Sequence, residues 1–152
     1  MEAKTTIQLK NGGVAVIDPQ DVTAVYGRVW RKSHFGYAVS TIPGEQRHVW
    51  MHRLITQAPD GMDVDHIDGD RLNNRRSNLR ICERCQNLWN TGRHSDSRSP
   101  FKGICHKGNG RWVARIMVRG KRMHLGTFGS AELARDAYLI AAKEMHGVFS
   151  KV

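Results

Sequence analysis

Apolar and polar residues alternate along the first third of the chain. In TTIQLKNGGVAVID, residues 5–18, apolar positions recur at every second residue on both sides of an Asn-Gly turn. This pattern is typical of a β-hairpin. The alternation continues through residues 26–41 and 46–55, which predicts further strands.

A shorter strand, residues 61–68, leads into the Asp-, Gly- and Asn-rich stretch DGDRLNNRRSN. Another short strand is expected at residues 77–83, and RCQNLWN, residues 84–90, is expected to form a short helix stopped by Gly92. The polar stretch therefore joins two strands that a helix follows. Asn and Gly favour tight turns and side-chain hydrogen bonds over core packing, so this stretch is a candidate site.

The last third of the chain predicts three strands and one long helix. The strands are expected at residues 101–107, 111–119 and 121–128, with short Gly-containing turns between them. Ser130 is a plausible N-cap of a helix that ends at Gly147. Its apolar positions fall on one face, which predicts a three-stranded sheet covered on one side by the helix. These positions are Ala134, Ala137, Tyr138, Ala141 and Met145.

Charge divides the chain into two unequal halves. The 152 residues carry a net charge of +10, and such a basic excess most often indicates a nucleic-acid partner. Residues 1–97 hold 13 basic against 11 acidic residues, and residues 98–152 hold 11 against 3, which gives net charges of +2 and +8. The Ser-rich stretch between them, which Pro100 closes, predicts a linker. We therefore expect an N-terminal domain over 1–92, a linker over 93–100 and a C-terminal domain over 101–152.

The candidate site combines one carboxylate, one imidazole and two carboxamides. Asp65 and His66 end the strand, Asn78 begins the next one, and Asn87 lies on the helix that should return over the first strand. Carboxylate and amide oxygens suit Mg²⁺ or Mn²⁺, and a neutral His is the usual general base near pH 7. A metal with a base fits phosphodiester hydrolysis, with Asn78 fixing the His segment.

The segments DHIDGDRLNNRRSNLR and CQNLWN together resemble the HNH endonuclease family, in its phage and homing-endonuclease branch. The resemblance covers about residues 15–92, with the core motif at 48–92, and implies a ββα-metal site. His66 then matches the general base and Asn78 the central Asn. Asn87 stands where the last His of the name-giving pattern would be. This departure implies a variant in which Asp65 and Asn87 bind one Mg²⁺ or Mn²⁺ ion, and it disfavours Zn²⁺.

Two other metal sites fit the sequence poorly. A Ca²⁺ loop beginning at Asp63 or Asp65 would need a Glu at its twelfth position, where the chain has Asn74 or Arg76. Cys82 and Cys85 form a CxxC pair, but a zinc site would need a second pair of ligands. Cys105 alone does not supply that pair. The three cysteines also predict no disulfide framework.

Several residues near the motif have two open interpretations. His52 could lie near the phosphate, with Arg53 on the DNA backbone, or it could pack against the core. Asn74 could stabilise the turn of the site loop. Arg75 could contact phosphate, and so could the neighbouring Arg76.

Strand alternation predicts a basic face on the C-terminal sheet, opposite the helix. This face suits a DNA groove because it carries no acidic residue. The segment 101–149 resembles the Apetala-type (ethylene-response-factor) domain, in which a sheet reads DNA. Cys105, Met117 and Asn109 depart from the plant pattern, so the plant sequence preference does not carry over. The predicted DNA-binding residues are Lys102, Lys107, Arg111, Arg115, Arg122 and His124.

The sequence thus predicts an α+β protein that is a metal-dependent DNA endonuclease of the phage homing type, with duplex DNA as its partner. The alternatives are a DNA-binding regulator with an inactive nuclease site and a protein that binds structured RNA. We see neither a signal peptide nor a membrane span and no sign of an obligate protein partner. We therefore expect an intracellular protein, in the host cytoplasm if a phage encodes it.

Overall fold

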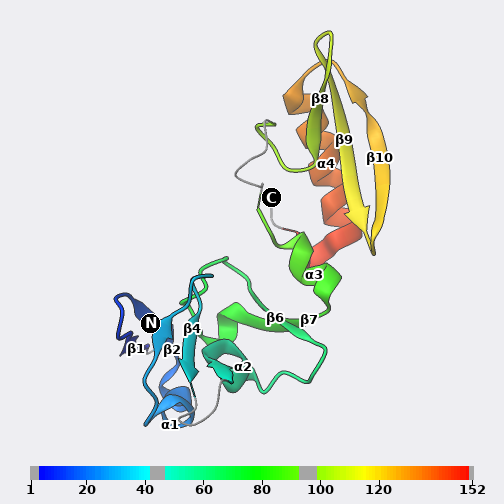
Figure 1. The fold of residues 1–152 in the computed structure, drawn as a ribbon. Helices are drawn as coiled ribbons and strands as arrows, with labels where there is room; N and C mark the ends of the chain where they lie inside the picture. Colours follow the sequence, from blue (N-terminus) through cyan, green and yellow to red (C-terminus); the bar gives the residue numbers. More distant parts are fainter. Residues whose placement is uncertain (1–3, 42–46, 93–98, 151–152) are drawn as a thin grey trace. The chain divides into compact units, whose positions relative to one another are not determined.

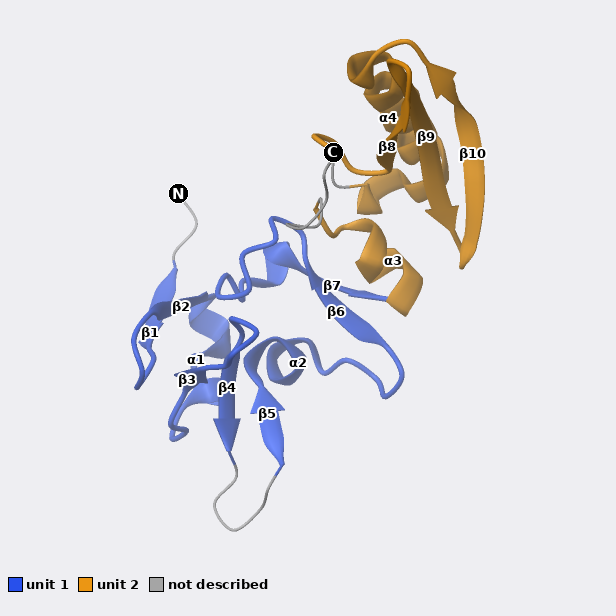
Figure 2. Cartoon of the chain, turned by 45° about the horizontal axis from the view of Figure 1, so that its top comes forward, with its two compact units in different colours: residues 1–83 blue, residues 84–152 orange. Residues whose placement is uncertain are grey.

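The computed structural model describes residues 4–41, 47–92 and 99–150. The chain forms two compact units, residues 1–83 and residues 84–152 (Figure 2). The short helix at the end of the predicted N-terminal domain therefore groups with the C-terminal unit. The predicted boundary at residue 92 stays a prediction, and residues 93–98 of the predicted linker lie outside the described residues.

The first unit begins with the predicted hairpin. β1 (Thr5–Gln8) pairs antiparallel with β2 (Val14–Ile17). Gly12 and Gly13 between them have φ values of 91° and 94°, which a residue with a side chain rarely adopts. A 3₁₀ turn, η1 (Pro19–Asp21), and a short helix, α1 (Val22–Val25), follow without having been predicted.

A second sheet has the order β3-β4-β5 and leads directly into a helix. Its strands are β3 (Arg31–Lys32), β4 (Ala38–Thr41) and β5 (His48–Trp50). The strand predicted over 46–55 is wrong in its second half, because Met51–Thr56 form the helix α2. Met51 and Ile55 are buried and lie four residues apart, so their burial follows the helical period and not strand alternation.

The third sheet of this unit is the hairpin that carries the candidate site. β6 (Asp63–His66) pairs antiparallel with β7 (Leu79–Cys82), and a 3₁₀ turn, η2 (Arg76–Asn78), precedes β7. Both strands were predicted. The core of the unit gathers side chains from all three sheets and from α1 and α2. Its most buried members are Ala15, Ile17, Ala38, Met51 and Ile55.

The second unit contains the predicted sheet and helix (Figure 1). After the short helix α3 (Arg84–Trp89), three antiparallel strands follow in the order β10-β9-β8. They are β8 (Ile104–Gly108), β9 (Arg111–Val118) and β10 (Lys121–Phe128). Helix α4 (Ala131–His146) packs on one face, and a 3₁₀ turn, η3 (Gly147–Phe149), ends the described fold.

The predicted start of α4 is confirmed, since the Leu133 amide donates to the Ser130 hydroxyl at 3.2 Å. The predicted α+β fold with a three-stranded antiparallel sheet on one helix is confirmed as well. Within the described ranges, no helix has the length and apolarity that crossing a bilayer requires.

Candidate functional site

Asp65 and His66 lie side by side at the end of β6, and both are buried. The pairing with β7 sets Asp65 opposite Arg80 and His66 opposite Leu79. Asp65 Oδ2 accepts a hydrogen bond from Arg80 Nε at 2.8 Å, and Arg80 Nη2 lies 2.6 Å from the same oxygen. The carboxylate is therefore held by a guanidinium inside the protein.

Asn78 ties together the loop that follows His66. Its Nδ2 donates to Asp68 Oδ1 at 2.9 Å and to the Asn73 carbonyl at 2.8 Å. Its Oδ1 accepts from the Asp68 amide at 3.0 Å. The carboxamide therefore uses both of its ends within one loop, which fixes the backbone directly after His66.

Asp68 is the acceptor at the centre of this loop. It also accepts from the Asp70 amide at 2.8 Å and from Asn73 Nδ2 at 2.8 Å. Burial raises the pKa of Asp68, but the hydrogen bonds from Asn73, Asp70 and Asn78 outweigh burial and leave the pKa below its ordinary value. The ionised form of Asp68 is thus part of the folded loop.

The loop is also docked on the N-terminal hairpin. The Asn74 amide donates to the Val16 carbonyl at 2.7 Å, and the Val16 amide donates to the Leu72 carbonyl at 2.9 Å. Asn74 is fully buried, and its Nδ2 donates to the Leu72 carbonyl at 3.0 Å. A stabilising role of Asn74 in the turn fits these contacts.

His66 lies against Asn74 and a group of rings. Its Nε2 is 3.4 Å from Asn74 Oδ1, and its ring centroid is 5.7 Å from that of Tyr37 and 5.3 Å from that of His52. Because Asn74 Oδ1 is an acceptor, the contact favours the tautomer with the proton on Nε2 and the lone pair on Nδ1. Burial lowers the pKa of His66. A neutral imidazole at pH 7 follows.

His52 packs within the same ring group. Its ring lies 5.0 Å from Tyr37 and 6.1 Å from Trp50, measured between centroids. Burial and, to a lesser degree, His66 lower its pKa to about 3. The buried Nδ1 of His52 has no hydrogen-bond partner among the residues described. The core interpretation of His52 fits this burial.

Two arginines that were predicted to lie near the phosphate form hydrogen bonds within the protein. Arg53 donates to the carbonyls of Met62, Ala58 and Pro59 at 2.7–3.1 Å, which closes the loop after α2. Arg75 Nε donates to Asp18 at 3.1 Å. Arg76, the third arginine considered for phosphate, forms an ion pair with the buried Asp21 at 2.7 Å. These contacts give the three side chains structural roles, and phosphate contact by Arg53 or Arg75 stays a prediction.

The predicted metal ligands lie in different compact units. Asp65 belongs to the first and Asn87, on α3, to the second, so their meeting at one ion stays a prediction. No group of three or more His, Cys, Asp or Glu side chains suited to a metal occurs among the residues described. A hard cation fits the predicted set all the same, because Mg²⁺ commonly takes one or two protein oxygens and fills its shell with water and phosphate.

The strand register places four of the predicted DNA-binding residues on one face of the C-terminal sheet. β10 pairs with β9 so that His124 lies opposite Arg115 and Arg122 lies opposite Met117, and all four are exposed. Arg111 has the same strand parity as Arg115. The opposite face holds Ala114 and Ile116 against α4. The charged face is therefore open to a ligand.

The two lysines of the predicted DNA-binding set differ from these residues. Lys107 is exposed and lies at a register irregularity of β8. Lys102 precedes β8, and its ammonium donates to the carbonyls of Trp89 and Thr91, both at 2.6 Å. Lys102 therefore binds the end of α3, and its role on DNA stays a prediction.

Sequence reasoning missed four members of the site. Tyr37 supports both histidine rings, and Arg71 lies over its ring with 4.8 Å between the guanidinium carbon and the centroid. Arg80 holds Asp65, and Asp68 organises the loop. The two strands predicted on either side of the site loop could have suggested Arg80. If these strands pair as an antiparallel hairpin, Arg80 is a candidate to lie opposite Asp65. Nothing local marks Tyr37.

A family model described as HNH endonuclease matches residues 46–88, the segment that contains α2, β6, the site loop and most of α3. An uncharacterized HNH endonuclease of Acanthamoeba polyphaga mimivirus is 31% identical over 124 residues, which is 80% of this chain and 64% of that protein. Protein 3.8 of Escherichia phage T7 is 30% identical over 94 residues, 61% of this chain and 77% of that protein. This chain therefore belongs to the HNH endonuclease family, a class of DNA-cleaving hydrolases that generally use a divalent metal.

The C-terminal segment is similar to plant DNA-binding domains of the AP2/ERF type. The Dehydration-responsive element-binding protein 2A of Arabidopsis thaliana is 41% identical over 63 residues, 40% of this chain and 19% of that protein. Both parts of the chain thus indicate DNA as the partner. No solved structure gave a significant match to the chain.

Proposed function

We propose that this chain is a metal-dependent DNA endonuclease of the phage homing type, in which the C-terminal sheet positions duplex DNA and the N-terminal site hydrolyses a phosphodiester bond. The viral relatives support action inside an infected host cell, in the cytoplasm if the chain is phage-encoded. One observation carries the proposal. A buried neutral imidazole follows a buried carboxylate at the start of a loop that side-chain amides lock in place.

In the proposed reaction, His66 is the general base. Its unprotonated Nδ1 accepts a proton from the water that attacks phosphorus, while Nε2 faces Asn74. The bond from phosphorus to the 3′-oxygen breaks, which leaves a 5′-phosphate and a 3′-hydroxyl. Asn78 holds the loop that carries His66.

Asp65 and Asn87 are the proposed ligands of one Mg²⁺ or Mn²⁺ ion. When bound, such an ion stabilises the charge on the phosphate and on the leaving oxygen. The pairing of Asp65 with Arg80 keeps the carboxylate oriented before a cation arrives. On the sheet, Arg111, Arg115, Arg122, His124 and Lys107 are the proposed contacts to the DNA backbone and bases.

A supercoiled-plasmid assay tests the nuclease proposal. With Mg²⁺ or Mn²⁺ the wild-type chain should produce nicked or linear DNA whose ends a ligase reseals without repair, and EDTA should stop the reaction. His66→Ala should lower the cleavage rate at least about 100-fold, since general bases contribute that much or more, while DNA affinity changes little. His34→Ala, at an exposed His, is the matched control and should cut normally.

Two results would contradict the proposal. An intact plasmid with every divalent metal would favour the alternative, a DNA-binding regulator with an inactive site. Undiminished cutting by His66→Ala would show that another group is the base.

A further inference from the structure

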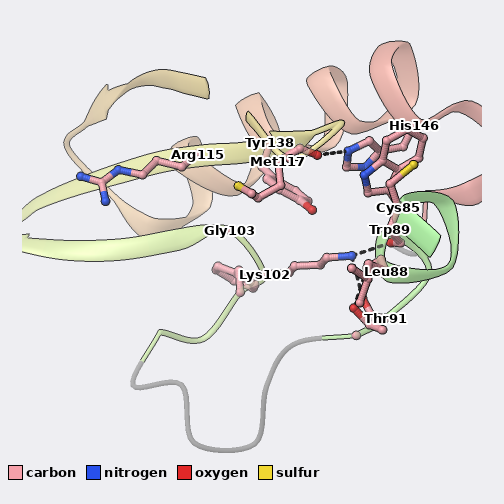
Figure 3. Close-up of a pocket in the computed structure, with 13 residues that line it drawn as sticks. Cys85, Leu88, Trp89, Thr91, Lys102, Gly103, Arg115, Met117, Tyr138 and His146 are labelled. Atoms are coloured by element: carbon pink, nitrogen blue, oxygen red, sulfur yellow. Dashed lines mark hydrogen bonds between the residues drawn. The ribbon is translucent and has the colours of Figure 1, made fainter. Parts of the chain in front are cut away.

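Helix α3 is a short helix of the second unit. It has six residues, none of them buried, and a helix so short is not stable alone. A cavity of about 380 Å³ lies beside it, lined by Cys85, Leu88 and Trp89 of α3 and by Met117 and Tyr138 of the C-terminal domain (Figure 3). Close packing is thus incomplete along this side of α3.

A lysine from outside the helix holds its carboxyl end. Lys102 lies just before β8 and donates from Nζ to the carbonyls of Trp89 and Thr91 (Figure 3). The last carbonyls of a helix have no partner within it, and a cation there also interacts favourably with the helix dipole. Both contacts measure 2.6 Å, so one ammonium binds the carbonyl of Trp89, the last residue of α3, and the carbonyl of Thr91 just beyond the helix.

An aromatic stack holds the same end of α3 to the core of the C-terminal domain. The rings of Trp89 and His146 are 4.4 Å apart between centroids and nearly parallel, at 11°. His146 is the last residue of α4 and is buried. Its Nε2 donates to the Met117 carbonyl of β9 at 2.8 Å, which anchors the ring to the sheet (Figure 3).

We propose that Lys102, Trp89 and His146, here called the α3 clamp, are positioning residues that set the place of Asn87. The inference rests on the proposed function, in which Asn87 binds the metal. Asn87 lies two residues before Trp89, so the clamp acts within one helical turn of the ligand. Helix α3, which carries Asn87, and the sheet proposed to bind DNA then move as one unit. In this arrangement Lys102 positions the metal ligand and does not contact DNA.

The test compares full-length variants in a titration with Mn²⁺, followed by the paramagnetic resonance signal of the free ion. Lys102→Met keeps the aliphatic stem and removes the donors. It should raise the dissociation constant for Mn²⁺ about tenfold, as loss of a group that orients a ligand does. Lys102→Arg should restore part of the affinity. Lys143→Met, the same change of charge on the exposed side of α4, should bind Mn²⁺ as the wild type does.

Two further measurements separate the clamp from a contact with DNA. Amides of residues 84–91 should exchange hydrogen faster in Lys102→Met than in the wild type. In cleavage assays Lys102→Met should lower kcat and leave KM for DNA within about twofold. Trp89→Leu, which removes the stack by another change, should affect Mn²⁺ affinity and amide exchange in the same direction, and it serves if Lys102→Met fails to fold.

The outcomes are distinct. If the wild type binds Mn²⁺ and cuts DNA, and both Lys102→Met and Trp89→Leu bind Mn²⁺ as tightly, this inference is overturned. The proposed function is then unaffected. A raised KM with unchanged Mn²⁺ affinity also overturns it and returns Lys102 to the DNA interface. A wild-type chain that binds no Mn²⁺ and cuts no DNA overturns the proposed function, and the inference with it.

Discussion

His52 and His66 lie edge to face inside the first unit, with ring centroids 5.3 Å apart. Burial lowers the pKa of both rings, and the pKa of His52 falls to about 3. A charged ring at either position would lose its hydration and repel a charge on the other. The folded state therefore holds this pair neutral.

This pairing makes stability depend on pH. Unfolded His52 binds a proton near pH 6.5 and folded His52 only near pH 3, so unfolding takes up a proton between these values. The free energy of unfolding should accordingly fall as pH drops below 6.5. In His52→Gln the loss between pH 7.5 and pH 5 should be smaller by up to about 2 kcal/mol.

Urea unfolding at pH 7.5 and pH 5 measures this difference. His34→Gln, at an exposed His, is the control and should keep the pH dependence of the wild type. An identical pH dependence in His52→Gln and the wild type would show that His52 is charged in the fold or that its burial is relieved by acid.

Local motifs explain which site residues the sequence predicted. Asp65, His66 and Asn78 lie within one strand-loop-strand segment, so their types and spacing indicate a site without knowledge of the fold. The ring of Tyr37 meets His66 only because separate sheets pack on one core, and no local pattern encodes that contact. The contacts of Arg53 and Arg75 within the protein could not be predicted either. The positive charge of an arginine does not show whether its partner is a protein oxygen or a phosphate.

Gly103, just before β8, lies very close to both strand β9 and helix α4. Gly103 has a φ of 73°, and its carbonyl accepts the Arg115 amide at 2.8 Å. A Cβ there would lie 2.6 Å from the Arg115 carbonyl oxygen and would also overlap the ring of the buried Tyr138. Backbone and ring leave no room for any side chain.

Gly103→Ala should therefore destabilise the C-terminal unit by about 2–4 kcal/mol, because overpacking adds to the strain of the positive φ. Gly110→Ala is the control, since its φ of 66° is equally unusual but its Cβ would meet nothing within 4 Å. Gly110→Ala should cost only about 1 kcal/mol. Thermal unfolding monitored in the far ultraviolet compares the two, and equal losses would contradict the close approach at Gly103.

The elements of the second unit could be predicted well because each has one buried face. In β9 the buried residues Ala114 and Ile116 are two positions apart, as strand alternation predicts. In α4 the buried residues Ala134 and Tyr138 are four positions apart, as the helical period predicts. Helix α2 could not be predicted, because its six residues follow β5 without a turn residue and a short apolar run fits either period. The α1 and η1 turns were missed because four residues carry too little pattern.

Charge is distributed unevenly over the molecule. Residues 98–152 carry a net charge of +8, against +2 for residues 1–97, and the exposed arginines of the sheet lie on the face opposite α4. A basic surface of this kind binds polyanions by releasing their counterions. Association with DNA should therefore weaken steeply as salt rises.

Arg115→Gln and Arg122→Gln should each weaken DNA binding and lower the slope of log affinity against log salt by about 1, the change expected when one phosphate contact is lost. Arg135→Gln is the control, because Arg135 lies on α4 and pairs with Asp136. Fluorescence anisotropy with a labelled duplex at several salt concentrations measures the slopes. Slopes that equal the wild-type slope in both variants would place DNA on another surface.

The division of the chain shows what composition can and cannot predict. The change in charge and the Ser-rich stretch predicted two domains, and the chain does form two compact units. Helix α3 belongs to the second unit, and its Trp89 contacts Lys102 and His146, which lie 13 or more residues further along the chain. Composition does not reveal contacts between residues so far apart in sequence. Such a pairing becomes visible only in three dimensions.

The hydrogen bonds between Val16 and the loop at Leu72–Asn74 have a consequence for how the protein matures on the ribosome. The N-terminal hairpin leaves the exit tunnel first, yet the segment it must dock against is made much later. Contacts that span so much sequence close slowly and late. The nascent hairpin would thus stay undocked until the loop had left the ribosome, and the site loop would take its folded form only after both ends of this long-range contact had emerged.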